Sequence, residues 1–170
     1  MDDTLGRHLV IVRHGKAEQS GPTDHARRLA DRGLEDASRL GTWIAGLALA
    51  APAVAYVSSA ARTTATWEQL APSLEALDVE VEVRDDLYAA GSDEARAVVA
   101  DTDPEVRTVL VVGHNPTMTA LALQLADTPG ETHDRLSLQG LPTCGCAVVG
   151  LAEWGAPGGD LTAFVTPREY

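Results

Sequence analysis

Three segments of the sequence place histidine, arginine and serine side chains directly after short apolar runs. The segments are Arg13-His14-Gly15 after residues 9–12, Ser58 to Arg62 after residues 54–57, and Gly113-His114-Asn115-Pro116 after residues 108–112. A neutral imidazole is a nucleophile near neutral pH, and guanidinium groups bind phosphoryl oxygens in a forked geometry. These residue types together suit phosphoryl transfer.

The placement of the three segments predicts that they meet in space. Each apolar run has the length and composition of a β-strand, and Arg62 and Pro116 stand where a helix would begin. In an open α/β sheet, ligands bind beyond the carboxyl ends of the strands. We therefore expect two histidines and two arginines around one anion, with helix N-termini adding N–H groups; these residues are Arg13, His14, Arg62 and His114. Taken singly, each segment could equally be structural, with its polar side chains solvated or hydrogen-bonded at the surface.

Strand-like runs alternate with helix-like stretches along the rest of the chain. Helices are expected over residues 33–49, 60–77 with a break at Pro72, 93–100 with Ser92 as the cap, and 116–126. An edge strand over 80–84 and two closing strands over 146–151 and 161–165 complete the sheet. Residues 128–140 are polar and contain proline and glycine, which predicts a surface loop. This alternation predicts a three-layer α/β/α sandwich with a mainly parallel central sheet, as one domain over residues 1–170.

The length and hydropathy of the chain fit a globular protein. The chain has 170 residues, of which 45% are hydrophobic, enough for a sizeable core. The longest weakly polar stretch, residues 44–57, is shorter than a bilayer span and contains Pro52, so no membrane segment is expected. The acidic start of the chain lacks the apolar region of a secretory signal, and we expect a cytoplasmic location.

The charge balance limits the partners that the chain can bind. The formal net charge is −12, with only 13 Lys and Arg. Proteins that bind nucleic acids or anionic membranes carry a basic surface, so neither partner is expected. A strongly acidic partner surface is also disfavoured, apart from a phosphate group itself. An anion-binding site in such a chain must gather its few cations locally.

The two cysteines, Cys144 and Cys146, are separated by a single residue. A disulfide over that spacing would be strained, and two thiols alone are too few for a usual metal site. We expect reduced thiols on or near a late strand.

At the three strand-end segments the sequence resembles the histidine phosphatase superfamily, and within it the SixA-like phosphohistidine phosphatases. Arg13-His14-Gly15, the Ser58 to Arg62 segment and the segment around His114 match the three main motifs of the family in order. Residues 27–33 resemble an Arg-Pro-Leu-Thr-x-x-Gly stretch of the SixA-like group. The resemblance covers about residues 8–127, and it implies a phosphoglycerate mutase-like fold.

The resemblance also implies roles for individual residues. His14 would be the nucleophile that forms a transient phosphohistidine, and Arg13, Arg62 and His114 would hold the phosphoryl oxygens. The further residues expected to bind substrate are Arg27, Ser58, Gly15 and Asn115. Neither a metal ion nor another cofactor is expected.

The sequence departs from the wider superfamily at the position of its general acid. Many members carry Leu-x-Glu where this chain has Leu87-Tyr88-Ala89, and a second departure puts Ala60 where proline is frequent. The nearby acidic residues are interpreted as a solvated loop; they are Asp85, Asp86, Asp93 and Glu94. An alcohol leaving group needs a proton from the enzyme, whereas a protonated phosphoimidazole leaves as a neutral ring. Ala89 therefore favours phosphohistidine over sugar phosphates as substrate.

Three functions fit these residues. The first is a metal-independent phosphatase that acts through phospho-His14, with a phosphohistidine-bearing protein as substrate. The second is a phosphomonoesterase for a small metabolite or nucleotide, and the third is a regulatory module that binds phosphorylated groups without catalysis. A monomer is expected, because the sequence has no long heptad pattern.

Overall fold

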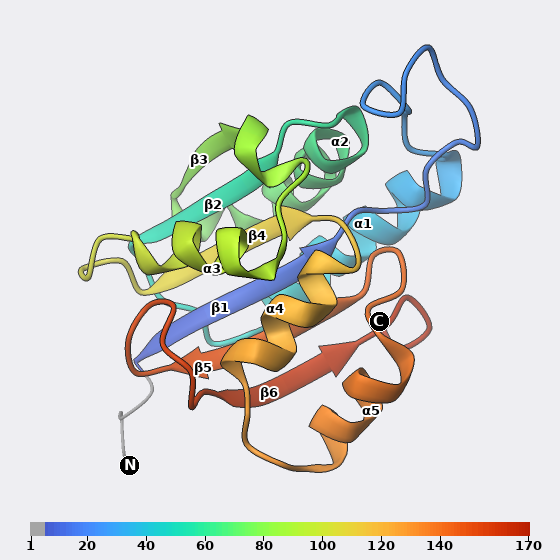
Figure 1. Cartoon of the computed structure of the whole chain (residues 1–170). Coiled ribbons are helices and arrows are strands. Elements are labelled where there is room, and N and C mark those ends of the chain that lie inside the picture. Colours follow the sequence, from blue (N-terminus) through green and yellow to red (C-terminus); the bar gives the residue numbers. More distant parts are fainter. Residues whose placement is uncertain (1–5) are drawn as a thin grey trace.

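A six-stranded sheet forms the centre of the protein, in the computed structural model that describes residues 6–170 (Figure 1). The start of the chain, on which the expected cytoplasmic location rests, lies outside the described residues. The strand order is β3-β2-β4-β1-β5-β6. The strands are β1 (Arg7–Arg13), β2 (Ala53–Ser58), β3 (Val79–Arg84), β4 (Thr108–Gly113), β5 (Cys146–Leu151) and β6 (Asp160–Val165).

The sheet is mainly parallel, as predicted. Strands β1 to β4 pair in parallel, whereas β5 is antiparallel to both β1 and β6. Strand β6 therefore runs in the same direction as β1, and Figure 1 shows their arrowheads at the same side of the sheet. The apolar strand β4 is central and wholly buried, and the alternating strand β3 is a largely exposed edge.

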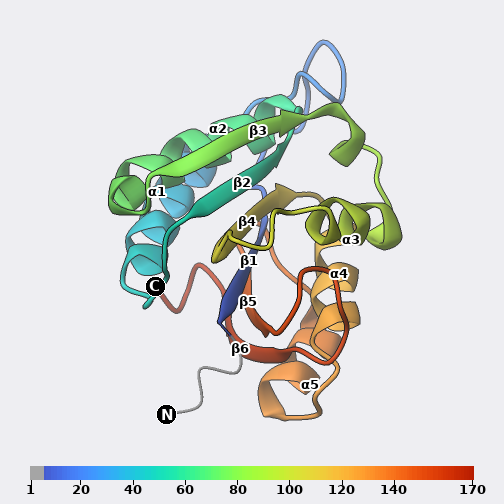
Figure 2. The ribbon, with the colours of Figure 1, turned by 90° about the vertical axis from the view of Figure 1, so that its left-hand side faces the viewer.

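Helices cover both faces of the sheet, which confirms the three-layer α/β/α sandwich (Figure 2). One face packs against α1 (Asp31–Ala45), α2 (Ala61–Leu70) and the 3₁₀-helix η1 (Ala71–Leu77), and the other against α3 (Ser92–Ala100), α4 (Thr117–Leu125) and α5 (Glu131–Gln139). Successive residues of a strand point to opposite faces. Val10 accordingly packs with Leu40 of α1, and Ile11 packs in the other core with Leu121 of α4. None of the helices in the described part of the chain is long and apolar enough to cross a membrane.

The helix α5 corrects the prediction of a surface loop over residues 128–140. Gly130 and Gly140 flank this helix, and Gly140 ends it with a φ of +64°. Only Leu136 of the helix is buried, so its sequence lacks the apolar stripe that identifies a helix. The turn residues therefore mark the two ends of a polar helix, and the prediction of a loop between them is wrong.

Two further predictions concern helix ends. The helix break expected at Pro72 is confirmed, because α2 ends at Leu70 and the following turns are 3₁₀. The expected cap at Ser92 is wrong, since Gly91 is the N-cap and Ser92 is the first residue of α3. No side chain of residues 6–170 caps this helix end, and the first bond within the helix runs from Ala95 N–H to the Gly91 carbonyl.

Both cysteines are free and buried, in agreement with the sequence. Burial raises the pKa of Cys144 to about 12 and raises the pKa of Cys146 further. The thiols are therefore protonated at neutral pH and pack as small apolar groups.

Candidate active site

The carboxyl ends of β1, β2 and β4 bring the three predicted segments together. Strand β4 lies between β2 and β1, so the residues that end these strands are neighbours. The ring centroids of His14 and His114 are 5.3 Å apart. The Ser58 Oγ atom lies 2.8 Å from Nε2 of His114, so Ser58 contacts the second histidine from the end of β2.

His14 is held as a neutral imidazole with one nitrogen available for attack. Its Nδ1 lies 2.8 Å from the Gly15 carbonyl oxygen, which can only accept, so Nδ1 carries the proton and Nε2 keeps its lone pair. Burial lowers the pKa of His14 to about 4, and the charges of Arg62, Arg13 and Arg27 act in the same direction. At neutral pH this imidazole is a competent nucleophile.

His114 is also held as a neutral imidazole. Burial lowers its pKa to about 4, and nearby His14 and Arg62 lower it further, whereas the Asp24 carboxylate opposes this shift. Its Nδ1 is buried and has no hydrogen-bond partner among residues 6–170. A dianion bound beside this ring would raise its pKa and make it a donor.

Arg62 lies in the first turn of α2, as predicted, and its side chain is almost fully buried. One Nη atom donates to the Asp24 carbonyl at 2.8 Å and the other to Asp24 Oδ2 at 3.2 Å. Its buried Nε has no hydrogen-bond partner in the described part of the chain. A guanidinium has five N–H groups, so Asp24 fixes the orientation of Arg62 while other N–H groups stay available for an anion.

Arg13 and Asn115 share one acceptor, the carbonyl oxygen of Leu141. Arg13 donates to it at 3.0 Å and the Asn115 amide at 2.7 Å. The Asn115 Oδ1 atom accepts hydrogen bonds from the N–H and the hydroxyl group of Thr119. The structure thus places Asn115 in contacts that hold the loop at Leu141, and leaves Arg13 half-buried beside His14.

Gly15 and Arg27, which the resemblance implies as substrate-binding residues, make contacts within the protein that support the site. The Gly15 N–H donates to Thr66 Oγ1 at 3.0 Å, and a Cβ at Gly15 would lie 2.8 Å from the Gly33 carbonyl oxygen. Glycine is needed there for close packing. Arg27 donates from Nε to Asp24 Oδ1 at 3.0 Å and contributes its charge to the field at His14.

Asp24, which contacts Arg62, and Tyr88, which contacts Asp24, were not predicted from the sequence and complete this cluster. The Asp24 carboxylate accepts from Arg62, from Arg27 and, at 2.6 Å, from the Tyr88 hydroxyl. The Tyr88 bond and then the two arginines lower the pKa of Asp24 to about 2, so the carboxylate is ionised at neutral pH. Tyr88 is the residue before Ala89, the position of the family's general acid. This adjacency is the one feature of the sequence that could have placed Tyr88 at the site.

Aromatic rings extend from the two histidines toward solvent. The Tyr88 ring meets His114 edge-on at 5.7 Å, and exposed His25 meets Tyr88 at 4.8 Å. His25 also reaches Ser59 Oγ, at 3.0 Å from its Nε2.

The acidic residues near Ala89 form the solvated loop that the sequence predicted. All four are exposed: Asp85, Asp86, Asp93 and Glu94. Asp86 pairs with Arg84 at 2.7 Å, and Asp93 accepts from Gln124. Within residues 6–170, no group of three or more His, Cys, Asp or Glu side chains is arranged to hold a metal ion.

Comparison with known sequences defines the family of this chain. The family model of the histidine phosphatase superfamily (branch 1) matches residues 9–91, which include His14 and Arg62. The chain is 34% identical over 153 residues to the uncharacterized protein ML1117 of Mycobacterium leprae, covering 85% of this chain and 89% of that protein. The chain belongs to the histidine phosphatase superfamily.

Solved structures agree with this assignment. A proposed phosphohistidine phosphatase SixA from Nakamurella multipartitia is 31% identical with a TM-score of 0.79, covering 95% of this chain and 96% of that one. The protein histidine phosphatase SixA in complex with tungstate is 26% identical with a TM-score of 0.73, covering 95% and 97%. The phosphoglycerate mutase-like fold is therefore confirmed, and the comparisons support a phosphatase.

Proposed function

We propose that this protein is a metal-independent phosphohistidine phosphatase that acts on a phosphorylated protein. The observation that carries the proposal is the state of His14, a buried neutral imidazole whose Nδ1–H is bound to the Gly15 carbonyl. The charges of Arg62 and Arg13 act on this ring and the His114 ring is 5.3 Å away, so phosphoryl oxygens bound beside Nε2 would be close to these groups. The SixA-like neighbours support the same substrate class.

In the first step, the lone pair of His14 Nε2 attacks phosphorus and the P–N bond of the substrate breaks. The substrate imidazole, protonated on its other nitrogen, takes the bonding electrons and leaves as a neutral ring. Arg13, Arg62 and His114 would stabilise the charge on the phosphoryl oxygens, and each donor of this kind contributes about 3–4 kcal/mol to a transition state.

In the second step, water attacks phosphorus and the bond to His14 Nε2 breaks. Because Nδ1 keeps its proton through the Gly15 contact, His14 also leaves as a neutral imidazole. The water proton goes to the released phosphate or to solvent. Both steps thus expel the same leaving group, and neither needs a proton from an enzymic acid.

This symmetry favours phosphohistidine over a phosphate ester. An alcohol leaving group needs a general acid, which is worth about 10²–10⁴-fold in rate. Ala89 stands at the acid position of the family, and the carboxyl group nearest to Arg62, that of Asp24, has a pKa of about 2 and is ionised. Asp24 therefore has no proton to donate at neutral pH.

Trapping the covalent intermediate tests the proposal. We expect wild-type protein, mixed with a ³²P-labelled phosphohistidine peptide and quenched rapidly in base, to carry the label, because phosphohistidine survives base. His14→Ala should carry none, and His133→Ala on α5 serves as the matched control. We expect kcat/KM for the peptide to exceed that for a panel of phosphate esters by about 10²-fold or more. A chelator should leave the rate unchanged.

Each contrary result identifies a different function. Faster hydrolysis of esters than of the peptide would establish a phosphomonoesterase for small substrates. Binding of the peptide without label on the wild type would establish a phospho-binding module. Label on both wild type and His14→Ala would move the nucleophile to another residue.

A further inference from the structure

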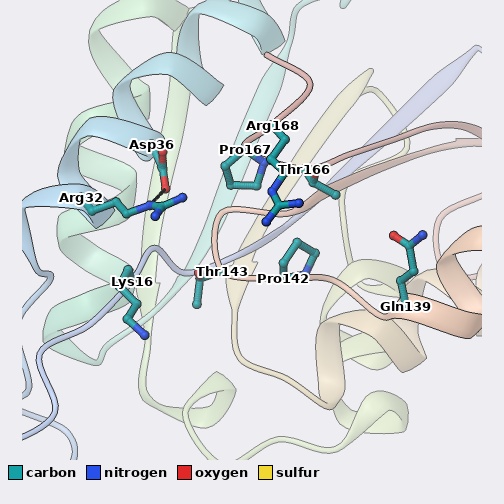
Figure 3. Close-up of a pocket in the computed structure, with 9 residues that line it drawn as sticks. All are labelled: Lys16, Arg32, Asp36, Gln139, Pro142, Thr143, Thr166, Pro167 and Arg168. Carbon is teal, nitrogen blue, oxygen red and sulfur yellow. Dashed lines mark ion pairs between the residues drawn. The ribbon is translucent and has the colours of Figure 1, made fainter.

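A second, basic groove lies beside the site and takes no part in the proposed chemistry (Figure 3). The groove is open to solvent and has a volume of about 520 Å³, and its charged lining residues are Lys16, Arg32, Asp36 and Arg168. Pro142 and Pro167 form part of its walls. We call it the basic groove.

The basic groove opens at the same edge of the sheet as His14. Lys16 follows the end of β1, and Arg168 follows the end of β6, a strand that runs in the direction of β1. Arg32 lies in the first turn of α1, where Ala30 N–H donates to the Lys16 carbonyl at 2.8 Å. The cluster of His14, Arg62 and His114, the catalytic cluster, therefore lies at the ends of β1, β2 and β4, and the basic groove lies over β1, β5 and β6.

One loop separates the groove from the catalytic cluster. The Leu141 carbonyl accepts from Arg13 on the catalytic side, while Pro142 and Thr143 line the groove. Lys16 is two residues from His14, so their Cα atoms are at most about 7 Å apart. A ligand in the groove would thus lie within a few residues' length of a phosphoryl group at His14.

The groove carries uncompensated positive charge. Asp36 is only 10% exposed, and its carboxylate is shared between Arg32 at 3.5 Å and Arg39 at 3.4 Å. Within the part of the chain that the structure describes, neither Lys16 nor Arg168 forms an ion pair. Figure 3 shows Arg32 and Arg168 extending from opposite walls toward the middle of the groove. A chain of net charge −12 has thus gathered cations at a second place on this edge.

We propose that the basic groove is a docking site for an acidic segment of the phosphorylated protein substrate, close in sequence to its phosphohistidine. This inference rests on the proposed function. The side chain of Arg32 is 74% exposed, and Lys16 and Arg168 are exposed as well. Such solvated charges select a partner and speed its encounter more than they hold it tightly. The net charge of −12 disfavours an acidic partner over the surface as a whole, as the sequence predicts, and the cations of the basic groove make this face a local exception.

The test compares two peptides and two matched charge reversals. The peptides carry one phosphohistidine with either three glutamates or three glutamines at the second to fourth positions after it. The variants are Arg168→Glu in the groove and Arg107→Glu, an exposed residue before β4 at the opposite edge of the sheet. Arg32→Gln is a second groove variant. Phosphoimidazole, a small phosphoramidate, reports the chemistry without docking.

We expect wild type and Arg107→Glu to prefer the acidic peptide about fivefold or more in kcat/KM at low salt, which corresponds to about 1 kcal/mol for exposed ion pairs. Arg168→Glu and Arg32→Gln should reduce this preference and leave phosphoimidazole hydrolysis unchanged. The preference should also decrease as salt is added.

Equal kcat/KM of wild type for the two peptides would overturn the docking site, as would equal loss of preference in Arg107→Glu. Hydrolysis of phosphoimidazole separates this failure from failure of the proposed function. If wild type hydrolyses phosphoimidazole but shows no preference between the two peptides, only the docking site is overturned. If wild type hydrolyses neither, fluorescence anisotropy with the unphosphorylated peptides still decides whether the groove binds the acidic one more tightly.

Discussion

At the scale of single residues, Asp24 has two opposing effects on the anion site. Its carbonyl and carboxylate oxygens fix the guanidinium of Arg62, which would otherwise lose orientation. Its negative charge, however, partly neutralises Arg62 and Arg27, the cations that a phosphoryl group would need. Substrate binding would therefore compete with a carboxylate that is already in contact with Arg62, Arg27 and the Tyr88 hydroxyl.

Replacement of Asp24 by asparagine separates the two effects. Asp24→Asn keeps an oxygen acceptor and the carbonyl contact but removes the charge. Inorganic phosphate should then inhibit at roughly fivefold lower concentration, because an exposed ion pair is worth up to about 1 kcal/mol. Asp24→Ala should instead lower kcat, since Arg62 loses its side-chain acceptor. Asp86→Asn, at the exposed Arg84 pair, is the control. An unchanged inhibition constant in Asp24→Asn would contradict the competition.

At the scale of elements, the start of α1 supports the segment that carries His14. A Cβ added to Gly33 would lie 2.2 Å from the Lys16 carbonyl oxygen and 2.8 Å from the Lys16 nitrogen. These are backbone atoms, so they cannot move away as a flexible side chain would. The helix and the segment from His14 to Lys16 thus pack at a distance that only glycine allows.

Substitution of Gly33 by alanine should displace this segment. We expect Gly33→Ala to lower kcat/KM at least tenfold, because displacing a catalytic group by about 1 Å costs about 10²-fold. The free energy of unfolding in urea should fall by about 1–3 kcal/mol, as for an overpacked core. Gly46→Ala at the other end of α1, where the nearest atom is 3.3 Å away, should change both little. Wild-type activity and stability in Gly33→Ala would refute the supporting role of α1.

At the scale of the whole molecule, two buried neutral histidines make stability depend on pH. The pKa of His14 and that of His114 are each about 4 in the folded protein, against 6.5 for an unperturbed histidine. Between pH 4 and 6.5 the unfolded chain therefore binds more protons than the folded one. The stability linked to these groups is full above pH 6.5 and is lost as the pH falls toward 4.

Urea unfolding at pH 7.5 and pH 5 measures this linkage. Between these values wild type should lose roughly 2 kcal/mol more stability than His114→Asn, because that variant lacks one of the two titrating groups. The two rings are neighbours and titrate as a pair, so His14→Asn should give a similar difference. His133→Asn on α5 is the matched control. Equal pH dependence in wild type and His114→Asn would show that His114 is not buried as a neutral ring.

Particular elements show how much could be predicted from the sequence. The strands that end at the site were predictable because apolar, β-branched runs are followed directly by Arg13, Ser58 and Gly113. Helix α5 was not, since a polar helix with one buried leucine has no apolar stripe. The contact between Asp24 and Arg62 joins residues 38 positions apart through an irregular loop, and no local pattern marks it.

The family, the three-layer fold and the positions of His14, Arg62 and His114 at strand ends follow from the sequence alone, because strand patterns and strand-end motifs are local properties of the chain. The tertiary structure decided the neutral state of both histidines, the Asp24 contacts and the basic groove. Burial and charge at a point in space depend on segments far apart in sequence, here the loop before α1 and the chain after β6. Only folding brings those segments to the edge of the sheet where His14 lies.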